Sequence, residues 1–282
     1  MQRPLPDAVS AVLSGTGFGL LLWLGISVAL VPPGAGMAAL RAPQMWSLIL
    51  ALALLCVAAA IAVSASAAPR SVRSLLHAPT RWHLRRNALA SSAAALALAV
   101  GGLLSWAPSG APRALALGLV GMLLSLTSLG VVVANAVARP SAASSAVPHP
   151  LIVPVQVLTA LSTGLALMFA LLAGLLAVGP GGGRMLIILL VLGVLAAATS
   201  ALYWRDARAG GNGRPAARDF RASSLATPAL LAAVPALAWA MSAAEVGGST
   251  LWLWVISVAS FTAAVVDRHA FLTHAAAPDR PT

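Results

Sequence analysis

The sequence contains no lysine, a single cysteine and only six acidic residues. One cysteine excludes an intramolecular disulfide. It also excludes an iron–sulfur cluster held by this chain alone, because such a cluster normally takes four protein ligands. Cys56 lies inside a hydrophobic run, so we expect it to be a small packing residue.

Charge of either sign is scarce. Charged residues make up 8% of the chain and hydrophobic residues 60%, with a mean hydropathy of +0.94. A soluble domain of 282 residues could not bury so much apolar surface, so the composition predicts a polytopic membrane protein. The net charge of +11 is carried by arginines in short loops between hydrophobic runs. This pattern excludes a nucleic-acid-binding face and leaves lipid headgroups or an acidic partner protein as counter-charges.

Apolar runs of about 20 residues, separated by Gly, Pro and Arg, predict an all-α bundle of eight transmembrane helices. We expect residues 1–282 to form one integral membrane domain. The predicted spans are residues 9–31, 44–67, 87–107, 112–138, 151–178, 184–203, 225–244 and 250–270.

Two arginine clusters decide the predicted orientation, because residues 70–86 and 205–221 hold five arginines each. With eight spans, both termini share one side with the loops after the second, fourth and sixth spans. This side, called the arginine-rich end below, carries fourteen of the seventeen arginines. The positive-inside rule predicts an inner (cytoplasmic) membrane protein with both termini in the cytoplasm. We expect a folded partner to dock there.

No Asp, Glu, Lys, Arg or His is expected near the middle of any span. A charged residue there costs roughly 2.5–3.5 kcal/mol on insertion scales and normally has a functional reason. The absence disfavours an ion-coupled permease and an intramembrane protease, and the five histidines are not placed to hold a haem. We predict no metal site, since His77 and His83 have no Cys or carboxylate neighbours.

The segment between the second and third spans has two interpretations. In the first, its histidines are solvated or contact lipid headgroups. In the second, the segment lines a pocket for a quinone headgroup at the membrane surface. The residues of that candidate pocket are His77, Arg81, Trp82, His83 and Arg86. Similarly, Tyr203 and Trp204 at the end of the sixth span anchor the helix in the membrane interface, or they contact a partner or a quinone.

Several segments resemble, in order, the membrane anchor subunit of the dimethyl sulfoxide reductase family. They are the glycine-spaced residues 9–20, the basic segment 69–86, His149-Pro150-Leu151-Ile152-Val153-Pro154, Leu202-Tyr203-Trp204-Arg205, and Val266-Asp267-Arg268 with Phe271. The resemblance implies an eight-helix protein that tethers an iron–sulfur subunit and a molybdopterin catalytic subunit. The candidate docking residues are Arg70, Arg73, Arg85, Tyr203, Trp204, Arg205 and Arg208.

The chain departs from that family at the expected quinol site. The family carries His-Leu-Gly before the proline that opens the basic segment and a Glu that closes it. Here the positions hold Ala65, Ser66 and Ala67, and then Asn87. Asn cannot titrate and Ala offers no polar group, so the expected proton-accepting pair is missing. Either His77, His83 or Asn87 serves the quinol site in place of that pair, or the chain is a purely structural anchor.

We therefore expect a non-catalytic membrane anchor subunit of a molybdopterin and iron–sulfur oxidoreductase. It would bind no cofactor by itself and no haem, with menaquinone or ubiquinone as the candidate ligand of the surface pocket. Two alternatives stay open. One is a small multi-spanning permease, and the other is a structural or assembly membrane protein without a redox role.

Overall fold

The computed structural model describes residues 4–30, 36–65, 81–105, 111–137, 150–176, 181–209 and 225–275. These residues are almost entirely helical and include no strand. Eight of the described helical segments are long and apolar enough to cross a membrane. The predicted all-α fold with eight spans is confirmed, and the chain is a multi-pass membrane protein.

Each predicted span corresponds to one helical segment. In chain order the elements are α1 (Pro4–Leu30), α2 (Gly36–Ala65), α4 (Arg81–Ser105), α5 (Ala111–Val137), α6 (Ile152–Leu175), α7 (Gly181–Ala209), η1 (Ala229–Ala233), α9 (Val234–Ala243) and α10 (Ser249–Ala275). The seventh span, Leu225–Ala243, contains the π-helical turn η1 and helix α9.

Two helices continue into the arginine clusters. Helix α4 begins at Arg81 rather than at residue 87, and α7 ends at Ala209 rather than at residue 203. Arginine is a good helix former, and a helix keeps its backbone hydrogen bonds within itself on both sides of the membrane surface. The assignment of residues 81–86 and 204–209 to loops was therefore wrong, and the arginines at these positions are carried on helices.

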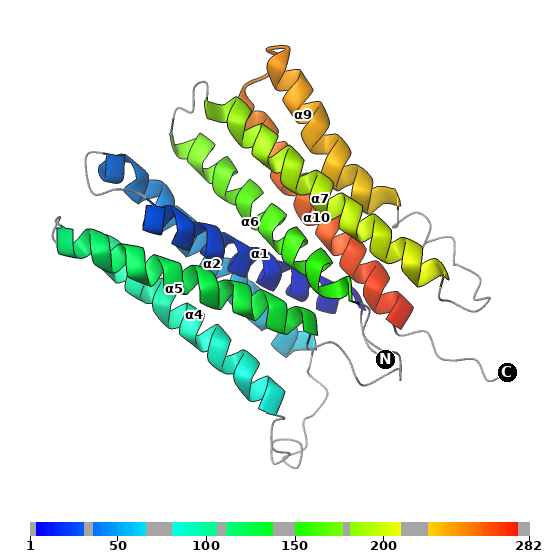
Figure 1. The fold of residues 1–282 in the computed structure, drawn as a ribbon, viewed down its shortest axis with the longest axis horizontal. Coiled ribbons are helices and arrows are strands. Elements are labelled where there is room, and N and C mark those ends of the chain that lie inside the picture. The colour runs from blue at the N-terminus through cyan, green and yellow to red at the C-terminus, as the bar shows by residue number, and fades with distance from the viewer. Residues whose placement is uncertain are drawn as a thin grey trace.

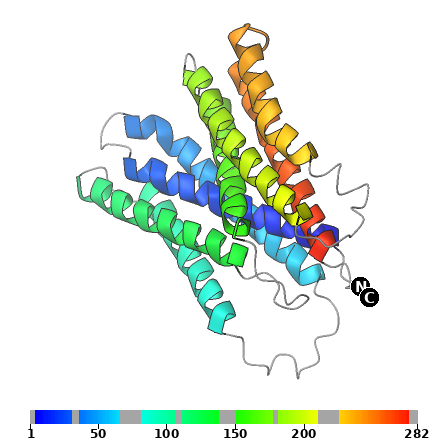
Figure 2. The same ribbon diagram turned by 45° about the vertical axis from the view of Figure 1, so that its right-hand side comes forward.

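The eight spans are arranged in two halves, which can be followed in Figures 1 and 2. The first half contains α1, α2, α4 and α5, and the second half contains α6, α7, the η1–α9 segment and α10. In each half the first span packs against the second and fourth, and the third packs against the fourth. The first spans of the two halves, α1 and α6, pack against each other. Both halves therefore have the same helix-packing order.

Glycines bring α1 and α6 into backbone contact where the halves meet. A Cβ atom at Gly19 would overlap the carbonyl group of Ala160, and one at Gly164 would overlap the backbone of Gly19. Small residues allow this approach, and van der Waals packing is a main source of helix association in lipid. Next to this contact, the Thr16 hydroxyl donates to Oγ1 of Thr163 at 3.2 Å.

The same kind of contact occurs within the second half. A Cβ atom at Gly193 in α7 would overlap the carbonyl oxygen of Leu231 in η1. Pro235, four residues after Leu231, has no amide hydrogen to donate to that carbonyl, and the helix widens into π geometry there. The irregular seventh span is thus held closely against α7.

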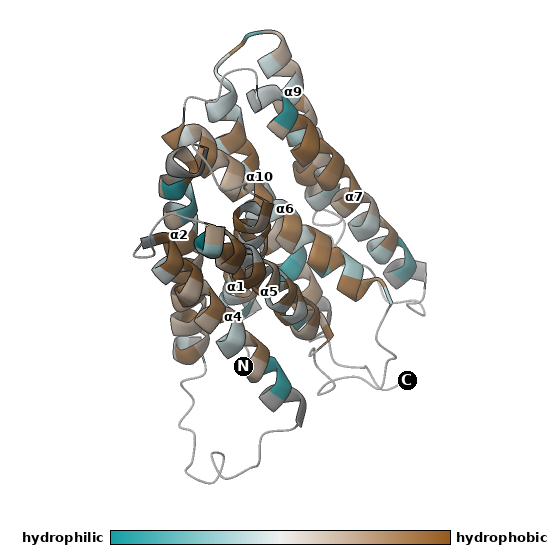
Figure 3. Ribbon diagram, turned by 60° about the vertical axis from the view of Figure 1, so that its left-hand side comes forward, coloured by the Kyte–Doolittle hydropathy of each residue, from teal (hydrophilic) through white to brown (hydrophobic). Residues whose placement is uncertain are grey.

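The outward surfaces of the helices are apolar. Figure 3 shows brown, hydrophobic residues along the helices and teal, hydrophilic residues mainly towards their ends. Exposed apolar side chains include Leu98, Leu115, Leu126 and Val258, each at least 60% exposed. In a membrane these side chains face the lipid chains.

Candidate functional site

A cavity of about 610 Å³ opens where the two halves meet. Its lining comes from α1, α2, α4, α5, α6, α7 and α10. The lining residues Asp7, Arg86 and Phe271 belong to the helix ends that the sequence places at the arginine-rich end. The volume lies in the range of sites for small molecules and cofactors.

The cavity reaches well into the bundle. Along α1 it is lined from Asp7 to Phe18, a separation of eleven residues that corresponds to about 16 Å of helix. This length is about half of the hydrocarbon thickness of a bilayer. Apolar side chains such as Phe18 and Leu55 line the deep part of this path.

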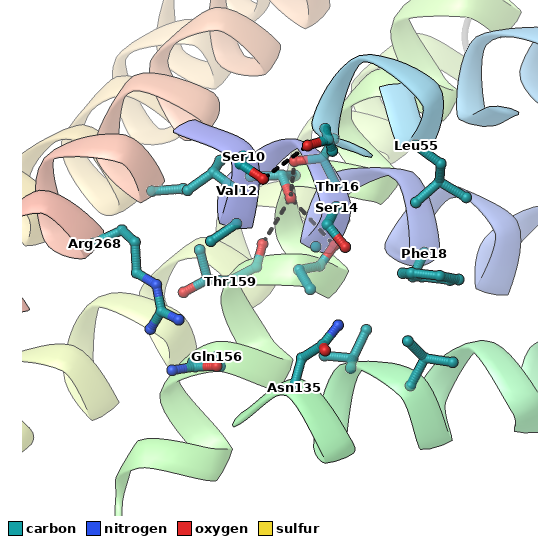
Figure 4. A pocket seen from close by; sticks show the side chains of 18 of the residues that line it. Ser10, Val12, Ser14, Thr16, Phe18, Leu55, Asn135, Gln156, Thr159 and Arg268 are labelled. Atoms are coloured by element: carbon teal, nitrogen blue, oxygen red, sulfur yellow. Dashed lines mark hydrogen bonds between the residues drawn. The ribbon is translucent and has the colours of Figure 1, made fainter. Parts of the chain in front are cut away.

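Three hydroxyl groups of the lining donate to backbone carbonyls. Ser10 donates to the carbonyl of Ala58 at 2.9 Å, Thr159 to that of Val155 at 2.7 Å, and Thr163 to that of Thr159 at 2.9 Å. Two amide side chains are different. Asn135 of α5 and Gln156 of α6 form no hydrogen bond with any described residue, and both lie beside the open space in Figure 4. Their amide groups are available to a ligand.

Asp267 of α10 is held in the wall of the cavity by two donors from α7. The Trp204 indole Nε1 donates to Oδ1 of Asp267 at 2.7 Å, and the Ser200 hydroxyl donates to the same oxygen at 3.1 Å. Trp204 and Ser200 are each 1% exposed. The second oxygen, Oδ2, forms no hydrogen bond within the described part of the chain. Asp267 thus presents one fixed and one available oxygen.

Arg268 lies next to it and is the most buried arginine among the described residues, with 8% of its surface exposed. Its guanidinium lies 5.4 Å from the centre of the Phe271 ring. In Figure 4 the side chain points into the cavity towards Gln156 and Thr159. No described carboxylate or carbonyl pairs with its guanidinium. A buried arginine is costly unless an acceptor or an anion meets it, so this side chain favours a ligand oxygen in the cavity.

Aromatic rings support both ionisable residues. The rings of Tyr203 and Trp204 meet edge to face with centroids 5.0 Å apart, and those of Tyr203 and Phe271 are 6.1 Å apart. Together with Val155 and Ala270 they form a small buried cluster between α6, α7 and α10. The cluster keeps Trp204 oriented towards Asp267.

Two of the six predicted quinone-binding residues line the cavity. Arg86 and Asn87 contribute from the first turns of α4, and Arg86 donates to Oδ1 of Asn87 at 3.5 Å. Arg81, Trp82 and His83 are in the same helical turns, but their side chains lie outside the described residues, as does all of His77.

The predicted docking residues separate into two groups. Arg85 is exposed, and the Arg205 side chain is 79% exposed at 3.7 Å from Asp206. Tyr203 and Trp204 are 8% and 1% exposed, so they face the bundle interior rather than the membrane interface, which was one of their two predicted places. Arg70, Arg73 and the Arg208 side chain lie outside the described residues.

Sequence reasoning missed the four polar residues that distinguish this cavity. Asp267 and Arg268 fell near the predicted end of the last span, whereas α10 continues to Ala275 and places both inside the helix. Asn135 and Gln156 are the amide side chains of α5 and α6, two membrane-spanning helices that are mainly apolar. A polar side chain within a membrane-spanning helix often has a functional role, and a search for such side chains would have identified Asn135 and Gln156.

The comparisons with known proteins add no family. No family model matches the chain, and neither curated proteins nor solved structures give a significant match. The resemblance to the dimethyl sulfoxide reductase anchor subunit thus stays a prediction from the sequence.

Proposed function

We propose that this chain is the membrane anchor subunit of a multi-subunit molybdopterin and iron–sulfur oxidoreductase, and that its cavity binds the headgroup of a menaquinone or ubiquinone. The observation that carries the proposal is the cavity itself. It is lined by Arg86 and Asn87 at the arginine-rich end, and along α1 it reaches from Asp7 to Phe18, about 16 Å deeper.

The chemistry of the lining suits a quinone. A quinone headgroup has two carbonyl oxygens that accept hydrogen bonds, and its isoprenoid tail needs an apolar path. The guanidinium of Arg268 and the amides of Asn135 and Gln156 supply donors, and Phe18 and Leu55 supply apolar surface.

The proposed place of the partner is the arginine-rich end, in the cytoplasm, with the chain in the inner (cytoplasmic) membrane. Arg85 and Arg205 are exposed on helices that begin or end there. Exposed arginines suit an acidic surface of an iron–sulfur subunit, and the positive-inside rule favours this orientation. Electrons would pass between the quinone and clusters of that subunit.

Purification of the tagged chain in mild detergent tests the anchor role. We expect a co-eluting assembly that contains molybdenum and iron. The double variant Arg85→Glu with Arg205→Glu should release the partner, whereas Arg184→Glu, exposed at the opposite end, should retain it. A wild-type chain that always elutes alone contradicts the proposal.

Orientation has a separate test. A fluorescent protein that folds only in the cytoplasm, fused after Thr282, should be bright in cells, because the proposal puts both termini on that side. A dark fusion, together with an active periplasmic reporter at the same position, contradicts the proposed docking side.

Asp267 and Arg268 favour a second candidate, a proton-coupled permease. Ionisable side chains that face a cavity within the spans are common in ion-coupled carriers, and the sequence-based argument against a permease rested on their absence near mid-span. Reconstituted proteoliposomes separate the two functions: quinone binding without solute uptake supports the anchor, and proton-driven uptake without quinone binding supports the permease.

A further inference from the structure

We propose that Arg268 and Asp267 together form the headgroup subsite of the cavity, in which Arg268 binds a quinone oxygen and Asp267 exchanges a proton with it. This inference rests on the proposed quinone function and adds the two residues that would do its chemistry. Neither belongs to the quinone-binding residues predicted from the sequence.

Arg268 is the cation of the proposed subsite. Its side chain is more than nine-tenths buried, points into the cavity and has the Phe271 ring as its neighbour at 5.4 Å. Within the described part of the chain its guanidinium forms no ion pair with the adjacent carboxylate of Asp267, whose Oδ1 accepts hydrogen bonds from Trp204 and Ser200 instead. A guanidinium in this position recognises a partly negative oxygen, such as a quinone carbonyl or the oxygen of a semiquinone or quinolate.

Asp267 is the carboxyl group of the proposed subsite. Two donors occupy Oδ1, so a proton that joins this carboxyl group binds at Oδ2, which is free of described donors. Both Asp267 and Arg268 line the same cavity. Consecutive residues on a helix point about 100° apart, so the two side chains can approach one headgroup from different directions.

With an iron–sulfur subunit as electron acceptor, the proposed oxidation of a quinol balances in protons and electrons. On quinol oxidation, one quinol O–H bond breaks and an O–H bond forms at Oδ2 of Asp267, while the second proton goes to water at the cavity mouth. Two electrons go to one-electron iron–sulfur acceptors of the proposed partner. Asp267 then releases its proton to water, and quinone reduction runs through the same steps in reverse.

Other charged or titratable groups also face the cavity. Asp7 comes from α1, Arg86 from α4 and Tyr203 from α7. Asp7 is exposed at the mouth, and Tyr203 packs in the aromatic cluster behind Asp267. Among the described acidic residues, Asp267 is therefore the one placed inside the cavity next to the buried cation.

Binding of decyl-ubiquinone to the purified full chain tests Arg268. We expect Arg268→Gln to weaken binding by about 10-fold to 100-fold, the loss of a hydrogen bond from a charged donor. Arg268→Lys should recover part of the affinity, and Arg184→Gln at the opposite end should bind like wild type. Equal affinity of Arg268→Gln and wild type, in folded protein, overturns this subsite. Absence of binding to wild type overturns the proposed quinone function instead.

Redox-induced infrared difference spectra of the same complex test Asp267. Electrochemical reduction and oxidation of bound decyl-ubiquinone should change the carbonyl-stretch band of a protonated carboxyl group. The band should disappear in Asp267→Asn and persist in Glu245→Gln, which is exposed at the opposite end. Should Asp267→Asn misfold, wild-type chain labelled with ¹³C-aspartate provides the measurement, because the band must then shift. A band unaffected by both the variant and the label overturns the role of Asp267.

Discussion

The indole of Trp204 donates a 2.7 Å hydrogen bond to Oδ1 of Asp267. This contact joins the sixth span to the eighth and fixes a carboxylate in the wall of the cavity. Ser200, one helical turn before Trp204, donates to the same oxygen. Within the motif Tyr203-Trp204-Arg205, the two aromatic side chains thus face the interior of the bundle, and the Arg205 side chain faces outward.

Trp204→Phe should destabilise the protein while keeping an aromatic ring in the cluster. The variant removes one of the two donors to Asp267, and the loss of a hydrogen bond to a charged group costs about 1.5–3 kcal/mol. Denaturant unfolding in detergent, followed by circular dichroism, measures the change. Trp239→Phe is the matched control, because Trp239 is 42% exposed on α9. Equal losses for both variants would contradict a specific role for the Trp204 contact.

The number of spans was predictable because each apolar run has about the length that a bilayer requires. The ends of the helices were less predictable, since arginine is compatible with both a helix and a loop. Residues 81–86 and 204–209 were therefore placed in loops although they are helical.

The composition of the cavity was harder to predict than the fold. It joins Asn87, Asn135, Gln156 and Asp267 from four different helices. The apolar pattern of a single span does not tell which other spans pack against that span. The sequence did identify Arg86, because it lies in a segment where charge is concentrated, and Asn87, because it stands where the resembled family carries a Glu. Asp267 was missed because its two donors, Trp204 and Ser200, lie more than 60 residues away in the sequence.

Gly164→Ala should weaken the contact between the two halves. A Cβ atom at this position overlaps the backbone of Gly19 in α1, and overpacking of this kind typically costs about 1–3 kcal/mol. Thermal unfolding of the detergent-solubilised chain provides the measurement. Gly102→Ala is the control with the same change of residue, since no atom beyond its own turn of helix lies within 4 Å of its Cβ position. It should leave stability unchanged or raise it slightly, because alanine favours the helix over glycine.

The hydrogen bond between Thr16 and Thr163 should contribute measurably but modestly to the same contact. Both residues are 3% exposed, and their Oγ1 atoms lie 3.2 Å apart. Measured hydrogen bonds between membrane helices average about 0.6 kcal/mol, because the unfolded state in the membrane also finds partners. A double-mutant cycle with Thr16→Val and Thr163→Val gives the coupling free energy directly. A coupling near zero would mean that glycine packing alone holds this position.

Filling the cavity should block the ligand without unfolding the protein. Ala59 of α2 lines the cavity and is exposed, so a phenylalanine at this position can extend into empty space. We expect Ala59→Phe to lower the affinity for decyl-ubiquinone by about tenfold or more, equivalent to at least about 1.4 kcal/mol. Its unfolding midpoint should stay close to wild type. Ala60→Phe is the control on the neighbouring position, which is exposed but does not line the cavity, and it should bind normally. If Ala59→Phe and Ala60→Phe bind equally well, the ligand does not occupy this cavity, whatever the role of the arginine-rich end.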